Sequence, residues 1–276
     1  MKNFIIFLIF INNLFSLEKY KEENILSIWN VEEKKLKLVE HRKLKGLEQL
    51  NNLKFHDELW KIISEFYPED VINRIDKFVV FSDNNKNNRN GMSGLIESVD
   101  GTNNSRFILS IDIADAYYGN KISLEVFLNL LVHEFFHLVS LNDTQISPNY
   151  TKGVKIYEGY TYESSYINSF YEKFWNNSLG KKLEMLELNS KLSFAQKETI
   201  REEIYRYNQD KFIDTYAMTN MVEDIAVSFE DFIRLNKGYL GDSLKDKKID
   251  FFYSYADLVK YKNHFIQKKK EMIRKY

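Results

Sequence analysis

Three ionisable side chains stand inside a largely apolar run at residues 128–141, LNLLVHEFFHLVSL. They are His133, Glu134 and His137. On a helix, residues four apart lie on one face one turn apart, so both imidazoles can reach one ion while Glu134 lies beside them. This HExxH spacing suits a zinc site in which the histidines are ligands and the glutamate takes a proton from an attacking water.

The competing interpretation is that the run holds two core histidines and a surface glutamate. Against it, the chain has only five histidines, and two of them fall at ligand spacing. We therefore favour a metal site. Zn²⁺ suits two imidazoles and one oxygen ligand, so we expect one Zn²⁺ per chain.

A catalytic zinc site needs a third protein ligand, and the sequence offers two candidates. Asp143 follows His137 by six residues, where metzincin sites place their third ligand, but Ser140 replaces the glycine at which that chain turns. The other candidate is Glu223, in TYAMTNMVEDIAVSFEDF at residues 215–232. Asn220 suits a helix N-cap with Glu223 three residues on, so Glu223 could instead merely cap its helix.

The segment 215–232 resembles the third-ligand helix of gluzincins, namely a bacterial family of zinc-binding metallopeptidases and, more distantly, the catalytic domain of anthrax lethal factor. The shared pattern consists of Tyr216, Thr219, Asn220, Glu223, Ala226 and Phe229. The resemblance spans roughly residues 75–235 and includes the HExxH run. It implies that Glu223 is the third zinc ligand and that Tyr216 donates a hydrogen bond to the oxyanion of the tetrahedral intermediate.

One position departs from the gluzincin pattern. Those proteins commonly have an acid four residues after the ligand glutamate, where it supports a zinc histidine, but this chain has Val227. Partners of this kind tune metal affinity, so either Asp224 or Glu230 substitutes or the site is weakened. If the acceptor is missing, a glutamate at position 227 is expected to supply it.

The elements around these motifs predict an α+β fold, rich in helix and zincin-like, with a small sheet ahead of the HExxH helix. The strands expected are residues 77–83 and 106–114, separated by a polar loop at 84–94. The second of them alternates cleanly, and we expect it to bind an extended peptide along its edge. Residues 18–50 suggest an exposed helix or ribbon.

Helices are predicted both before and after the sheet. One covers residues 52–66 and ends at Pro68, and the central helix runs from a cap at Ser123 to about Leu141. Residues 157–178 are crowded with aromatic side chains, which suits helical core packing better than a substrate groove. Further helices are expected at about 181–210, at 220–236 and at the C-terminus.

Composition bounds the class of protein. The 276 residues are 44% hydrophobic and 29% charged, which is enough to bury a core, and the net charge of −1 gives no electrostatic case for nucleic acid or an anionic membrane. The absence of cysteine excludes thiol mechanisms, disulfides and a lipoprotein anchor. We expect a single domain over residues 17–276.

Residues 1–16 predict a secretory signal peptide, with an apolar run from Phe4 to Ile11 and a small residue at Ser16. An uncleaved anchor is the alternative. The sequence thus predicts a secreted zinc metallopeptidase that cleaves peptides or proteins, with Glu134 as general base and no membrane association after signal cleavage. The alternative, motivated by Val227, is a secreted binding protein on the same fold with little turnover.

Overall fold

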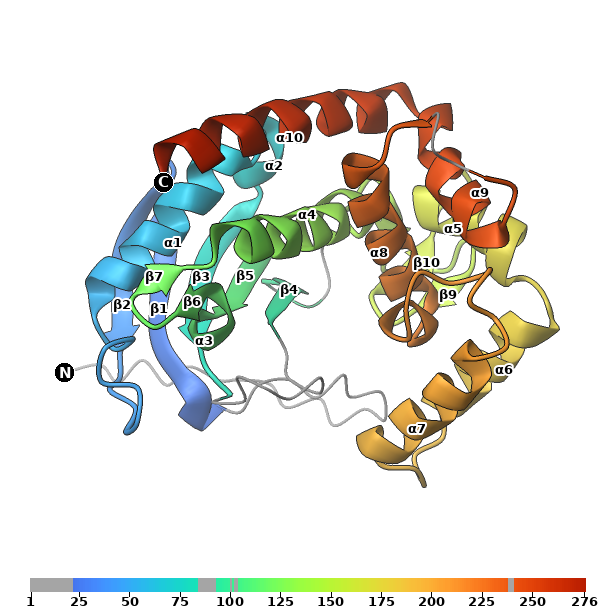
Figure 1. The fold of residues 1–276 in the computed structure, drawn as a ribbon, viewed down its shortest axis with the longest axis horizontal. Helices are drawn as coiled ribbons and strands as arrows, with labels where there is room; N and C mark the ends of the chain where they lie inside the picture. The colour runs from blue at the N-terminus through green and yellow to red at the C-terminus, as the bar shows by residue number, and fades with distance from the viewer. Residues whose placement is uncertain (1–21, 84–92, 100, 102–103, 238–240) are drawn as a thin grey trace.

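A five-stranded mixed sheet in the first half of the chain is followed by most of the helices, so the fold is α+β as predicted (Figure 1). A computed structural model describes residues 22–83, 93–99, 101, 104–237 and 241–276. The predicted signal peptide and most of the loop predicted at 84–94 lie outside these residues. Within the described part, no helix combines the length and apolar character needed to span a bilayer.

The sheet has the order β2-β1-β3-β5-β4. Only β3 and β5 run parallel, and the other neighbours are antiparallel. The strands are β1 (Ile25–Glu32), β2 (Lys35–His41), β3 (Ile75–Phe81), β4 (Gly94–Ser98) and β5 (Phe107–Asp112). For residues 18–50 the prediction was an exposed helix or a ribbon, and the ribbon is confirmed because β1 and β2 form a hairpin. The hairpin turns at Glu33 and Lys34, with φ of 49° and 65°.

The strand predicted at 106–114 is shorter than expected and does not lie at an edge. It ends at Asp112, whose side chain accepts a hydrogen bond from the backbone N–H of Ala114 and so begins a short helix. It also lies between β3 and β4, which occupy both of its backbone edges. The expectation that this strand binds a peptide along its edge is therefore wrong, because the edge strands of the sheet are β2 and β4.

Two smaller strand assemblies follow the main sheet. A ribbon joins β6 (Tyr117–Tyr118) to β7 (Lys121–Ile122), and a three-stranded sheet has the order β8-β10-β9. Its strands are β8 (Ile146–Ser147), β9 (Lys155–Ile156) and β10 (Gly159–Thr161).

The predicted helices are present, with one split. The region expected as one helix at 181–210 forms two, since Ser193 begins a new helix through a capping box with Gln196. The helical elements are η1 (Glu22–Asn24), α1 (Leu53–Phe66), α2 (Glu69–Ile72), α3 (Ile113–Ala116), α4 (Leu124–Ser140), α5 (Tyr166–Phe170), the π-helical η2 (Tyr171–Trp175), α6 (Ser178–Glu187), α7 (Phe194–Tyr205), η3 (Tyr216–Met218), α8 (Met221–Arg234), α9 (Leu244–Phe251), η5 (Phe252–Ser254) and α10 (Ala256–Lys275).

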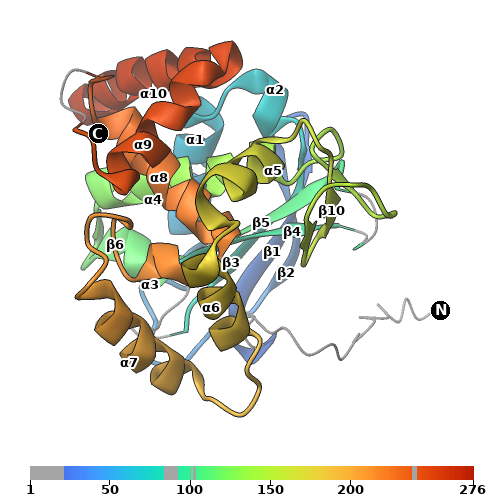
Figure 2. The same ribbon diagram turned by 90° about the vertical axis from the view of Figure 1, so that its right-hand side faces the viewer.

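Aromatic packing fixes the central helix α4 against its neighbours. Phe136 stacks against Phe229 of α8 with ring centroids 4.6 Å apart, and Phe135 meets Phe265 of α10 at 4.7 Å. In Figure 1, α10 runs along the top of the molecule above α1, α2 and α4, and Figure 2 shows the sheet and these helices from the side. The helical core packing predicted for the aromatic residues at 157–178 holds only from α5 onward, where Phe170 and Trp175 are fully buried. Tyr157 and Tyr162 precede that helix and are exposed.

Candidate metal centre

Helix α4 presents both histidines of the HExxH run to one point. His133 Nε2 and His137 Nε2 lie 3.0 Å apart, and each residue is only 7% exposed. The helix begins at Ser123 as predicted, but the Ser123 side chain makes no capping hydrogen bond. The second half of α4 is covered by other elements, since all residues from Leu131 to Ser140 are buried. The two imidazoles are therefore held in a rigid, water-poor setting.

Helix α8 brings Glu223 to the same point. The Asn220 side chain caps the helix by accepting hydrogen bonds from the backbone N–H groups of Val222 and Glu223. The Glu223 carboxylate faces the histidines, with Oε2 at 3.0 Å from His133 Nε2 and 3.5 Å from His137 Nε2. The reading of Glu223 as only a capping residue is therefore wrong, and His133, His137 and Glu223 form a buried group that could bind one metal ion.

The donor set of these three residues fits a cation. Glu230 Oε1 lies 2.8 Å from His133 Nδ1, and because a carboxylate only accepts, we infer that the proton of the neutral ring is on Nδ1. His133 Nε2 then turns a lone pair toward Glu223 and His137, and such acceptors repel unless a cation or a proton lies among them. Ligand atoms around tetrahedral Zn²⁺ lie roughly 3.3 Å apart, close to the spacings here.

The electrostatics of the group favour positive charge at the same point. Burial lowers the pKa of His133, but hydrogen bonds to Glu223 and Glu230 and their charges outweigh it and hold the pKa well above its ordinary value. Burial raises the pKa of Glu223, but the neighbouring histidines outweigh it and hold that pKa well below its usual range. Both pKa shifts arise because a positive charge at this point is stabilised by the neighbouring carboxylates, and a bound cation would supply such a charge.

Glu230 supplies the acceptor that Val227 lacks. It stands seven residues after Glu223, two turns along α8, and bonds His133 Nδ1 directly. Val227 is buried and packs in the hydrophobic core. For His133 the acceptor that was expected to be missing is therefore present, and that ring does not need a glutamate at position 227. His137 Nδ1, by contrast, is buried and has no hydrogen-bond partner among the described residues.

The other two acids weighed from the sequence lie elsewhere. Asp143, the metzincin-type candidate, has a side chain that is 45% exposed and is paired with Arg74, with Oδ1 and Nη1 2.9 Å apart. Asp224 is fully buried but turns away from the histidines, because its Oδ2 accepts hydrogen bonds from Lys248 and Trp175. Neither belongs to the group formed by the histidines and Glu223.

Glu134 is buried beside the group, against strand β4. The residue is 3% exposed, its Oε2 has no partner among the described residues, and burial raises its pKa. Gly94 on β4 makes room for it, since a Cβ at position 94 would lie 2.5 Å from Glu134 Oε1. The sequence reasoning missed Gly94 because it placed this residue in a loop, although the apolar pair that follows, Leu95 and Ile96, is a signal for a strand.

Tyr216 lies at the edge of the same group. Its ring centroid is 5.9 Å from that of His133, and 47% of the residue is exposed. Burial of the hydroxyl end, together with the charges of Glu223 and Glu134 and a hydrogen bond to Glu223, raises the pKa of Tyr216 well above its usual value. The phenol therefore stays protonated near neutral pH and can donate a hydrogen bond.

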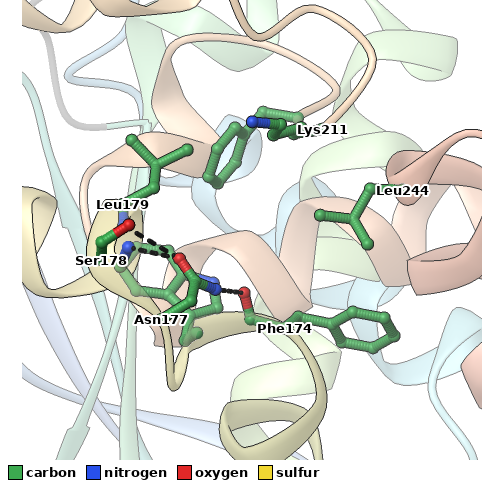
Figure 3. A pocket seen from close by; sticks show the side chains of 9 residues that line it. Phe174, Asn177, Ser178, Leu179, Lys211 and Leu244 are labelled. Carbon is green, nitrogen blue, oxygen red and sulfur yellow. Dashed lines mark hydrogen bonds between the residues drawn. The ribbon is translucent and has the colours of Figure 1, made fainter.

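A cavity of about 170 Å³ lies away from this group, at the start of α6 (Figure 3). Phe174, Leu179 and Leu244 give it apolar walls, and Lys211 lies at its margin. The Asn177 carboxamide already accepts from the backbone N–H groups of Leu179 and Gly180, so the helix end is not free to bind an anion.

In comparisons with protein-family models, curated proteins and solved structures, nothing matches this chain. The structure itself supports a buried group of His133 and His137 on α4 and Glu223 on α8 that could bind one metal ion.

Proposed function

We propose that the protein is a zinc metallopeptidase of the gluzincin type. The observation that carries the proposal is the convergence of His133, His137 and Glu223 on one buried point, with Glu134 next to it on the same helix. HExxH with a glutamate as third ligand is a donor set that suits Zn²⁺ with one position left open for substrate. When bound, Zn²⁺ would polarise the scissile carbonyl and lower the pKa of the attacking water to about 7.

Three side chains would carry out the proton transfer, the stabilisation of the oxyanion and the positioning of a ligand ring. Glu134 takes the proton of the attacking water and delivers it to the leaving amine, and its raised pKa brings it closer to the range in which a group both accepts and releases a proton. The Tyr216 hydroxyl donates a hydrogen bond to the developing oxyanion. Glu230 holds the His133 ring in place through Nδ1.

An extended peptide would pair with β4, an edge strand of the sheet. That strand passes Glu134 at Gly94, so a peptide bound along it by main-chain hydrogen bonds lies next to the general base. We further propose that residues 1–16 direct export and that the enzyme acts outside the cytoplasm. N-terminal sequencing of the exported protein would test that step, and a mature chain that still begins at Met1 would contradict cleavage after Ser16.

The binding-protein alternative was motivated by Val227, and for His133 that motive is weakened because Glu230 already supplies an acceptor. The experiment that tests peptidase activity is cleavage of casein and unstructured peptides, with and without a chelator, followed by readdition of Zn²⁺. Glu134→Gln should retain zinc and lose activity by several orders of magnitude. Glu125→Gln is the matched control, since Glu125 is exposed on the same helix. Equal cleavage by both variants would contradict the mechanism.

A further inference from the structure

The turn that carries a further carboxylate, that of Glu158, is tied to the end of the helix that carries the candidate metal ligands. Glu158 lies in the turn between β9 and β10, and its carbonyl accepts a hydrogen bond from Asn104 Nδ2 at 3.3 Å. The carbonyl of Asn104 in turn accepts from the backbone N–H of Asp143, three residues beyond the end of α4, at 2.9 Å. The turn is thus tied to the end of the helix that carries His137.

One oxygen of the Glu158 carboxylate has no hydrogen-bond partner in the described part of the chain. The residue is partly exposed, but its Oε2 is buried and makes no hydrogen bond, and none of the ion pairs among the described residues includes it. Burial raises its pKa, and the charges that act on it are those of His137 and Glu223, so it lies within electrostatic reach of the metal-binding group. A carboxylate left unpaired at such a depth is costly unless a ligand completes it.

A divalent cation at the histidines would not balance the charge around it. Glu134, Glu158, Glu223 and Glu230 are four carboxylates whose charges reach this centre, and Zn²⁺ supplies two positive charges. The negative charge of Glu230 also acts on Lys269, whose Nζ donates a hydrogen bond to Asn129 Oδ1. The side of the centre nearest Glu158 therefore keeps a surplus of negative charge.

We propose that Glu158 is a specificity-determining residue that binds a cationic group of the substrate, either a free amino terminus or a lysine or arginine side chain near the scissile bond. This inference rests on the proposed peptidase function. An ammonium or guanidinium group would make charge-assisted hydrogen bonds to Glu158 Oε2 and offset the surplus charge. A neutral residue at the same place would leave the carboxylate buried and unpaired, so the enzyme would discriminate against it.

The test uses matched peptides and three proteins. One peptide sequence is made with lysine or norleucine at each position flanking the scissile bond, and with a free or acetylated amino terminus, so that the two sources of positive charge are separated. For the wild type, kcat/KM should be higher for one cationic form. In Glu158→Gln the ratio of cationic to neutral kcat/KM should fall by roughly 10- to 100-fold. Glu163→Gln, which removes an exposed charge five residues later, should keep the wild-type ratio.

Binding and metal titration complete the test. In the Glu134→Gln background, calorimetry should show tighter binding of the preferred cationic peptide, and adding Glu158→Gln should remove the difference. Cleavage by the wild type without charge preference would overturn the role of Glu158 while leaving the peptidase function intact. A loss of zinc affinity of tenfold or more in Glu158→Gln would also overturn it, because Glu158 would then hold His137 or the metal. If no peptide is cleaved, the peptidase proposal fails, and calorimetry still decides whether Glu158 binds a cation.

Discussion

Glu223 and Asp224 are adjacent, buried and acidic, yet they face two different polar clusters on the two sides of α8. Asp224 Oδ2 lies 2.6 Å from Lys248 Nζ and 2.7 Å from Trp175 Nε1, so the chain itself supplies the cation. Glu223 has no lysine beside it in the described ion pairs and faces two imidazole nitrogens, at 3.0 and 3.5 Å, and the Tyr216 hydroxyl. The difference shows two ways to stabilise a buried carboxylate. Asp224 is neutralised by a lysine of the same chain, whereas Glu223, which faces ring nitrogens, needs a bound cation.

Breaking the Asp224–Lys248 pair should have the largest effect, and it should act on the free energy of unfolding. Lys248→Met leaves the Asp224 charge buried without its partner and should lower the free energy of unfolding by about 3–5 kcal/mol. Lys247→Met, on the exposed side of the same helix α9, should change it by less than about 0.5 kcal/mol. Denaturant titration of both variants measures the difference. Equal losses would mean that the Asp224–Lys248 pair does not stabilise α8.

Gly94→Ala probes the space beside Glu134. The added Cβ would meet the Glu134 carboxylate, so either the side chain or β4 must shift. A misplacement of about 1 Å at the general base should lower kcat about 100-fold, while zinc content stays at the wild-type level because no ligand is touched. Leu95→Ala, at the next position on β4, should keep kcat within a few-fold. A Gly94→Ala enzyme with normal kcat would show that Glu134 does not need its present position.

Glu230→Gln tests the support given to His133. Glutamine keeps an oxygen acceptor but loses the charge, so zinc affinity should fall by roughly 10-fold, the low end of the range for such partners. Competition titration with a chromophoric chelator measures it. Asp231→Asn, one residue later and paired with Arg234 on α8, is the control that should leave zinc affinity unchanged. Unchanged affinity in Glu230→Gln would mean that the His133 ring is held by packing alone.

Val227→Glu should have the smallest effect on zinc binding. Because Glu230 already bonds His133, a new carboxylate at position 227 has no role to fill there, and zinc affinity should change by less than about threefold. The same chelator competition measures it. A tenfold gain would show that the new carboxylate reaches His137 Nδ1, which has no partner in the described part of the chain.

The sequence predicted the parts of the site that depend on local periodicity. His133, Glu134 and His137 could be placed on one helix because a spacing of four residues fixes their common face. Glu223 followed only from the resemblance, because nothing local tells a ligand from a helix cap. The sequence also left open which of Asp224 and Glu230 supports a histidine ligand. The answer depends on which side of α8 faces α4 and which faces Lys248.

Properties that depend on long-range pairing could not be predicted. The strand at β5 has the alternation of a half-exposed strand, yet Ser110 and Asp112 are fully buried and both of its backbone edges are paired. Its neighbour β4 has only five residues and follows a polar loop, and the short apolar pair within it does not reveal which strand it pairs with. Gly94 and Glu158 matter because of what lies near them in space, which no spacing along the chain reveals.

The most direct test of the central claim is the zinc content of the purified protein, measured by mass analysis beside the Glu223→Ala and Asp143→Ala variants. The account predicts one Zn²⁺ per chain in the wild type, loss of tight binding in Glu223→Ala, and one Zn²⁺ retained in Asp143→Ala, because Asp143 is paired with Arg74 at the surface. A wild type without zinc after dialysis against the metal, or a Glu223→Ala variant that retains it at full stoichiometry, would contradict the assignment of this centre.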